Sequence, residues 1–391
     1  MKNEKKVQQF LSRSARIGRR RRRIRRRRGR RGRRRRRNQQ SLHLPEAIIE
    51  EVLSRLPVQS LLRLRCVSKS WGSLIGCERF IKTHHQNSIK NPSFPHQRVF
   101  LQKETFGRCV QCSLQSILRA RVSPSPLADP TNTTLMPSLT LGCYNGLLCI
   151  LDESRRRIEL WNPSTRISKK LLEISSPSYV MSSGFGWVES SGEYKVFVLL
   201  VNIIDNDEWK RVGKVYSSKT KTWKTIEFCD DLLWCWIGGW FAGGKLYWQK
   251  TEDDQEDIIF LDLKSEVFGR IELPFPFHHN AIHIDDKYIV GVLGGCLCVL
   301  YYSPLFYYYQ RGLRVSRVWV MKEAWEEVMT LSHLNELLQP PLVSLNGEIL
   351  VDCGSILLVY NVGCNMFRIP GVCLDLCSHV YVESLVSPED V

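Results

Sequence analysis

The sequence predicts a multidomain protein, a small helical module followed by an all-β propeller of about six blades. Two observations predict this fold: apolar residues recur at helical spacing over about residues 44–81, and a tight-turn dipeptide then returns about every fifty residues. With 391 residues, 43% of them hydrophobic, the chain is long enough to bury a substantial core. We divide it into an Arg-rich tail (1–40), a helical module (41–86), a linker (87–94) and a propeller domain (95–391).

The basic charge of the chain lies in the tail. Residues 1–40 hold 21 of the 56 Lys and Arg residues but one of the 39 acids, and the remaining 351 residues carry a net charge of −3. Between Arg13 and Arg37, 18 of 25 residues are Arg, a density that predicts disorder. Such a tract is typical of a nuclear-import signal or a phosphate-binding arm, and equally of a low-complexity extension without a role.

The Arg-rich tail also bears on the cellular compartment in which we expect the protein. It has no apolar central region of the kind a secretory signal has, and the 14 cysteines are scattered, so we expect a reducing compartment, no disulfides, and localisation in the nucleus and/or cytoplasm. Ile289–Tyr309 is an uncharged stretch long enough to span a membrane as a helix. Gly294-Gly295 and Ser303-Pro304 favour instead two buried strands joined by a turn, so we expect no membrane span.

Short amphipathic helices are predicted for the helical module. Pro45 suits the first turn of a helix, and Pro57 ends it. One apolar stripe follows at helical spacing: Ile48, Ile49, Val52, Leu53 and Leu56. Further short helices are predicted around Leu61, Trp71 and Phe80. About forty residues bury too little surface to be stable alone, so the excess apolar surface favours a partner. Packing onto the rest of the chain is the alternative.

The module resembles an F-box. The matching residues are Leu44-Pro45, Ile49, Val52-Leu53, Leu56-Pro57-Val58, Ser60-Leu61-Leu62, Arg65-Cys66-Val67, Lys69-Ser70-Trp71 and Leu74-Ile75. Ser68 stands where the family often has Cys, and Leu64 where Phe is common. The resemblance implies docking on a Skp-family adaptor, which links F-box proteins to a cullin ubiquitin ligase. It implies these adaptor-binding residues: Leu44, Pro45, Ile49, Leu53, Leu56, Pro57, Leu61, Leu62, Cys66, Val67 and Trp71.

A turn dipeptide marks the repeat in the rest of the chain. It occurs as Asn145-Gly146, Ser191-Gly192, Gly243-Gly244, Gly294-Gly295 and Asn346-Gly347, with the second residues separated by 46, 52, 51 and 52 positions. Such pairs suit hairpin turns, in which the central residues take positive φ. Each turn is therefore expected to begin a strand at the same place in a repeated unit.

A second motif recurs in step with these turns. An apolar strand runs into a short polar residue, at Asn162, Ser217, Asp262 and Asn361, whose side chain can fold back on its own backbone. A strand–turn–strand unit of about fifty residues is the period of a kelch-like propeller blade. Five units are visible, and pairing of Val99-Phe100-Leu101 with Val380-Tyr381-Val382 would complete a sixth and remove the free sheet edges.

These units resemble the F-box-associated domain of plant F-box proteins. The matching stretches are Gly142-Cys143-Tyr144-Asn145-Gly146-Leu147-Leu148-Cys149, Leu160-Trp161-Asn162-Pro163-Ser164-Thr165, Gly184-Phe185-Gly186, Tyr194-Lys195-Val196 and Tyr381-Val382-Glu383-Ser384-Leu385. The resemblance implies a propeller that recruits a target protein. Candidate target-facing loops lie near 121–138, 202–211, 228–238 and 275–283. The Arg-rich tail is not part of the family pattern.

Catalytic and metal-binding patterns are weak. Cys109 and Cys112 lack a second ligand pair at zinc spacing, and His278, His279 and His283 fall in an expected loop. We expect no catalytic, cofactor or metal site. The predicted function is a non-catalytic substrate-recognition subunit of an SCF-type (Skp–cullin–F-box) ubiquitin ligase. Two alternatives stay open: a scaffold bound to nucleic acid through the tail, and a propeller enzyme with acids or histidines near the central channel.

Overall fold

The structure is a computed structural model of the chain. It describes residues 44–391 except 91–95, 103–108, 120–124, 127–138, 153–155, 177, 205–207, 229–237, 251–256, 275–286, 304–312, 335–339, 354–355, 365 and 371–377. The chain divides into two compact units, the first ending at Val52 and the second beginning at Leu53. The Arg-rich tail predicted at 1–40 lies outside the described residues.

The first unit holds the start of helix α2 (Glu46–Leu53). The carbonyl oxygen of Pro45 accepts hydrogen bonds from the backbone amides of Ile48 and Ile49, at 2.9 and 3.1 Å. Proline has no amide to lose at this position, so the helix begins where the sequence predicts.

Three more helices open the second unit: α3 (Val58–Leu64), α4 (Lys69–Gly76) and α5 (Glu78–Lys90). Pro57 caps the start of α3. Ser68, which departs from the family pattern, caps α4, because its Oγ accepts from the backbone amide of Trp71 at 3.1 Å. Helix α5 runs through Lys90, so it takes in part of the segment predicted as a linker.

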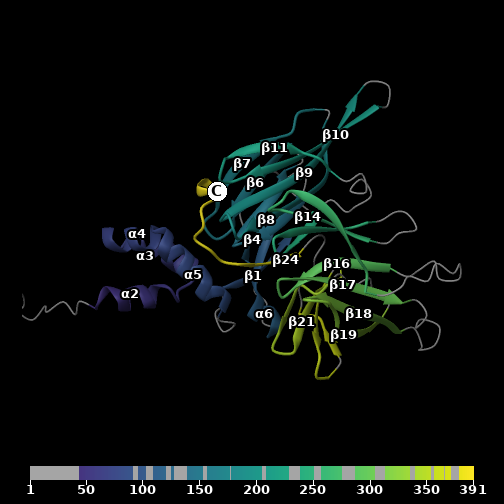
Figure 1. Ribbon diagram of the computed structural model, residues 1–391. Helices are drawn as coiled ribbons and strands as arrows, with labels where there is room; N and C mark the ends of the chain where they lie inside the picture. The colour runs from purple at the N-terminus through teal and green to yellow at the C-terminus, as the bar shows by residue number, and fades with distance from the viewer. Residues whose placement is uncertain are drawn as a thin grey trace, which may run out of the picture. The chain divides into compact units, whose positions relative to one another are not determined.

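The rest of the second unit is a ring of antiparallel sheets (Figure 1). Three of its sheets contain four consecutive strands each: β4 (Leu139–Tyr144), β5 (Leu147–Asp152), β6 (Arg157–Asn162) and β7 (Ile167–Glu173); β16 (Lys287–Leu293), β17 (Cys296–Ser303), β18 (Leu313–Met321) and β19 (Trp325–Leu334); β20 (Val343–Leu345), β21 (Glu348–Asp352), β22 (Leu357–Asn361) and β23 (Met366–Arg368).

An eight-stranded sheet joins two further groups of four. They are β8 (Tyr179–Val188), β9 (Glu193–Ile204), β10 (Glu208–Ser217) and β11 (Thr222–Ile226), then β12 (Gly238–Ala242), β13 (Lys245–Gln249), β14 (Asp257–Asp262) and β15 (Val267–Glu272). A short parallel pairing of β8 with β12 connects them. The expected hairpin at Ile289–Tyr309 is confirmed in its described part, because β16 and β17 turn through Gly294-Gly295, both at positive φ.

The two ends of the propeller domain share one sheet. Strand β24 (Ser378–Val382) lies beside β1 (Gln97–Gln102), followed by β2 (Cys109–Ser113) and β3 (Ser125–Pro126) (Figure 1). The predicted pairing of these two segments is confirmed, and its register places Val99 opposite Val380 and Phe100 opposite His379. With the eight-stranded sheet counted as two blades, the described strands form six groups of four, close to the six blades expected.

The core lies between neighbouring blades. One apolar cluster fills each junction between successive groups of four strands, and the last joins the closing sheet back to the β4–β7 sheet through Phe100, Tyr381 and Trp161. A blade is therefore stabilised by burying both of its faces against its neighbours.

Candidate functional site

An exposed apolar stripe runs along the first unit. Leu44, Ile48 and Val52 are 55%, 47% and 53% exposed, at intervals of four residues. Ile48 and Val52 lie on one face of α2 because they are four residues apart in the helix, and Leu44 precedes the start of α2 at the same spacing. Ile48 and Val52 stand outside the predicted adaptor-binding set, although their helical spacing already marks them. Of the predicted residues in this unit, Pro45 is exposed and Ile49 is half-buried.

The second unit divides the rest of the predicted set by burial. Val67, 62% exposed, and Cys66 lie at the surface, and four members are half-buried: Leu56, Pro57, Leu62 and Trp71. Leu53 and Leu61 are only 2% and 0% exposed, which places their side chains in the interior. In this conformation both side chains belong to the core of the small module, where apolar residues are most often found.

Helix α5 connects this module to the propeller through two buried histidines. The Nε2 of His84 lies 2.9 Å from the carbonyl oxygen of Leu56. The Nε2 of His85 lies 3.0 Å from Oδ1 of Asn145, in the turn between β4 and β5. Carbonyl and amide oxygens only accept, so Nε2 carries the proton in both rings. Burial lowers the pKa of both histidines, and both are therefore neutral at pH 7.

The turn that receives α5 is packed, whereas the matching turns are open. A Cβ on Gly146 would meet Oγ of Ser384 and the carbonyl oxygen of Val382 at 2.5 Å. The corresponding glycines of the other four turns, the last being Gly347, have no atom within 4 Å of that position. Helix α5, the first blade and the closing segment therefore meet at the Asn145-Gly146 turn.

A buried ion pair fixes the closing segment there. Glu383 accepts from Nε of Arg98 at 2.7 Å, and the backbone amide of Glu383 donates to the carbonyl oxygen of His96 at 2.9 Å. Burial would raise the pKa of the Glu383 carboxyl, but the hydrogen bond to His96 and the charge of Arg98 hold it below its usual range. The closing segment thus carries its own buried ion pair close to helix α5, which contacts β24.

Comparison with known proteins identifies both parts. Residues 41–83 match the F-box domain, and residues 113–366 match the F-box associated beta propeller domain. The chain belongs to the F-box proteins. The F-box/kelch-repeat protein At3g23880 of Arabidopsis thaliana is 27% identical over 376 residues, which cover 89% of this chain and 97% of that protein. F-box protein CPR1 of the same plant is 27% identical, covering 74% and 73%.

Solved structures match this chain only at low TM-scores. TolB from Acinetobacter baumannii aligns with 78% of this chain and 73% of its own at 9% identity, with a TM-score of 0.43. We base nothing on so low a score.

The family assignment confirms the predicted helical F-box followed by a propeller domain. An F-box implies binding to a Skp-family adaptor, and the propeller implies a target protein. F-box proteins are in general non-catalytic substrate adaptors.

Of the predicted target-facing loops of this F-box protein, 275–283 falls wholly outside the described residues, and 121–138 and 228–238 fall largely outside them. Segment 202–211 is mostly described, and apart from 205–207 it belongs to strands β9 and β10 instead of an irregular loop. His278, His279 and His283 also fall outside the described residues. Aromatic rings from different blades meet where the first strands of the blades converge. The ring centroids of Tyr144 and Phe241 lie 4.9 Å apart, and those of Trp240 and His379 lie 6.3 Å apart. Those strands present apolar packing at this point.

The described part of this F-box protein lacks metal-binding clusters and membrane-spanning helices. No group of three His, Cys, Asp or Glu side chains there could hold a metal ion. Cys112 is a buried strand residue, and burial raises the pKa of its thiol to about 11, which disfavours the thiolate that zinc binds. The described helices include none that is both long and apolar enough to span a bilayer.

Proposed function

We propose that this chain is the substrate-recognition subunit of an SCF-type ubiquitin ligase, with the F-box docked on a Skp-family adaptor and the propeller recruiting a target protein. The cullin joins through the adaptor. The ligase would act in the nucleus and/or cytoplasm, and this chain would position the target without taking part in the chemistry.

The observation that carries the proposal is the exposed stripe of Leu44, Ile48 and Val52. Burial of these half-exposed side chains in an interface is favourable, because it removes apolar surface from water. A stripe left open on a short helix fits a partner with an apolar groove. Val67 is a further exposed apolar residue and directly precedes Ser68, which caps α4.

The test is capture of the chain by an immobilised Skp-family adaptor, comparing wild type with Val52→Asp and Val67→Asp. Both side chains are exposed, so the variants are expected to fold and to lose at least about tenfold in affinity. Val267→Asp is the matched control, because Val267 is 59% exposed on β15, in the propeller. Leu53→Asp and Leu61→Asp are less informative, since they would also disrupt the core. Equal capture of all four proteins would overturn the proposal.

A further inference from the structure

We propose that His85 and Asn145 are positioning residues, which hold helices α3, α4 and α5 in one fixed orientation on the propeller. The effect of this positioning on ubiquitin transfer rests on the proposed function, because transfer depends on where the target is held. It does not rest on that function for its geometry.

One face of α5 is built for burial. Phe80, His84 and Ser88, spaced by four residues, are all buried, as is His85 beside them. Lys82, Gln86 and Ile89 are exposed. Two polar rings on the buried face are unusual for a helix that covers only an apolar core. Each ring makes one hydrogen bond through its Nε2, which offsets part of the cost of burying it.

His84 connects the helical module to the start of the propeller. Its Nε2–H donates to Leu56, immediately before α3, and its ring lies 6.1 Å from that of Phe80. The same ring meets His96 edge-on at 5.5 Å, and His96 directly precedes β1. One side chain thereby contacts a loop inside the F-box and the residue that directly precedes the propeller's first strand.

His85 fixes the angle of α5 on the first blade. Its Nε2–H donates to Oδ1 of Asn145, and Nδ2 of Asn145 donates to the Tyr194 hydroxyl on β9 at 3.2 Å. Asn145 has a φ of 50°, a conformation that asparagine tolerates better than most residues. Its side chain therefore joins α5 to two neighbouring blades from a rigid turn.

The chain contains a matched turn without this contact. Asn346 has a φ of 53° and is also followed by glycine, Gly347, whose Cβ position faces open space. Replacing either asparagine by glycine keeps the backbone conformation, since glycine takes positive φ freely. Only the change at Asn145 removes a link between helix and propeller.

The contact between α5 and the propeller sets where a bound target lies relative to helices α3, α4 and α5, because these helices share one compact unit with the propeller. A fixed orientation holds a target at one distance from the ubiquitin carrier, and a loose one spreads it over many positions. Transfer to a given lysine requires close approach, so loosening lowers the rate at preferred sites and spreads modification over others.

The experiment measures the distance between spin labels carried by non-canonical residues at exposed positions 69 on α4 and 264 in the β14–β15 turn, in the full chain. Wild type, His85→Gln and Asn346→Gly are expected to give one narrow distribution. The Gln amide replaces the Nε2 donor. His85→Ala and Asn145→Gly are expected to widen the distribution at least twofold. Unchanged width in these two variants would overturn the proposal.

Two further measurements separate this inference from the proposed function. Capture by the Skp-family adaptor is expected to be equal for all five proteins, because none of the changes touches the exposed stripe. In the reconstituted ligase, mapping of self-ubiquitination is expected to show more modified lysines for His85→Ala than for His85→Gln. A wild-type chain that does not bind the adaptor contradicts the proposed function alone, whereas equal lysine patterns contradict the positioning role.

Discussion

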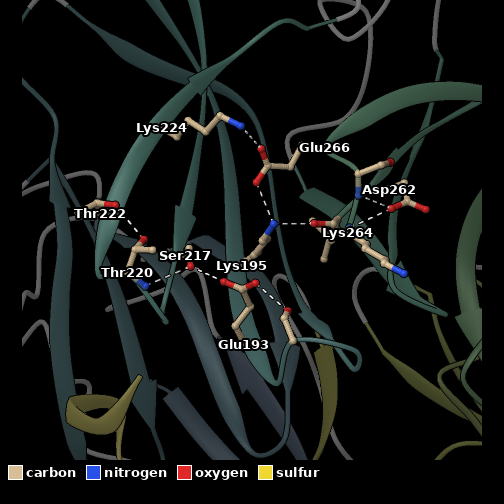
Figure 2. Close-up of polar contacts among 12 residues, drawn as sticks. Glu193, Lys195, Ser217, Thr220, Thr222, Lys224, Asp262, Lys264 and Glu266 are labelled. Carbon is tan, nitrogen blue, oxygen red and sulfur yellow. Dashed lines mark hydrogen bonds and ion pairs between the residues drawn. The ribbon is translucent and has the colours of Figure 1, made fainter.

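Lys195 joins two blades through a single buried cation. Its Nζ donates to the carbonyl oxygen of Leu263 and to Oε1 of Glu266, both at 2.8 Å, and exposed Lys224 binds the second carboxylate oxygen at 2.7 Å (Figure 2). Burial would raise the pKa of the Glu266 carboxyl, but the two lysines hold it lower. Lys195 belongs to a stretch that matches the family pattern, so the sequence singles it out. Its partner Glu266, 71 residues away, could not be predicted from the sequence.

Glu266→Gln is expected to lower the free energy of unfolding by about 3 kcal/mol, because it leaves the Lys195 charge buried without a carboxylate. Lys195→Met added to Glu266→Gln should recover most of the loss. Lys224→Gln, at a side chain 71% exposed, should change it by less than about 1 kcal/mol. Urea denaturation measures all four proteins, and a Glu266→Gln variant as stable as wild type would contradict this role.

The buried histidines make stability depend on pH. Burial lowers the pKa of His84 and His85, and it lowers that of His379 to about 4. The unfolded chain takes up these protons near pH 6.5, whereas the folded chain does so only at lower pH. Their stabilisation is therefore complete above about pH 6.5 and is lost as the pH falls below it. For His379 the loss is about 1.4 kcal/mol per pH unit down to about pH 4.

Urea denaturation at pH 7.5, 6.5 and 5.5 checks this dependence. The free energy of unfolding is expected to fall between pH 6.5 and 5.5, and His85→Gln, which cannot be protonated, should fall less steeply. A stability that stays level or rises over this interval would show that the histidines are not held neutral.

At the scale of elements, the repeated turns follow from local sequence. Oδ1 of Asn162, Asp262 and Asn361 each accepts from the backbone amides two and three residues later, as predicted. The buried position of Leu53 and Leu61 does not follow in this way, since periodicity shows that a helix is apolar but not which apolar side chains the core takes. The docking of α5 is also nonlocal, because His85 and Asn145 are 60 residues apart.

Asn162 does more than its counterparts. Its Nδ2 donates to the carbonyl oxygens of Ser384 and Val386, at 3.0 and 2.7 Å, and so fastens the closing segment to the β4–β7 sheet. Asn162→Ala is expected to cost about 2 kcal/mol more than Asn361→Ala, which removes the same kind of turn without that link. It should also speed amide hydrogen exchange over 383–391. Equal losses and equal exchange in the two variants would contradict the clamp.

At the scale of the molecule, ring closure could be predicted because unpaired edges are avoided and the terminal segments of the domain are both strand-like. The joining of two blades into one eight-stranded sheet could not. It depends on close approach: a Cβ at Gly239 would lie 2.5 Å from the Trp248 ring, and one at Gly184 would lie 2.7 Å from Leu246. Such contacts arise only when distant strands already lie together.

The most direct measurement is calorimetric titration of a Skp-family adaptor into the full chain, repeated with residues 44–391 and with Val52→Asp. We predict one adaptor per chain, a negative heat-capacity change from apolar burial, equal affinity without the Arg-rich tail, and affinity at least tenfold weaker for Val52→Asp. No heat of binding with the full chain, or equal binding by Val52→Asp, would contradict the account.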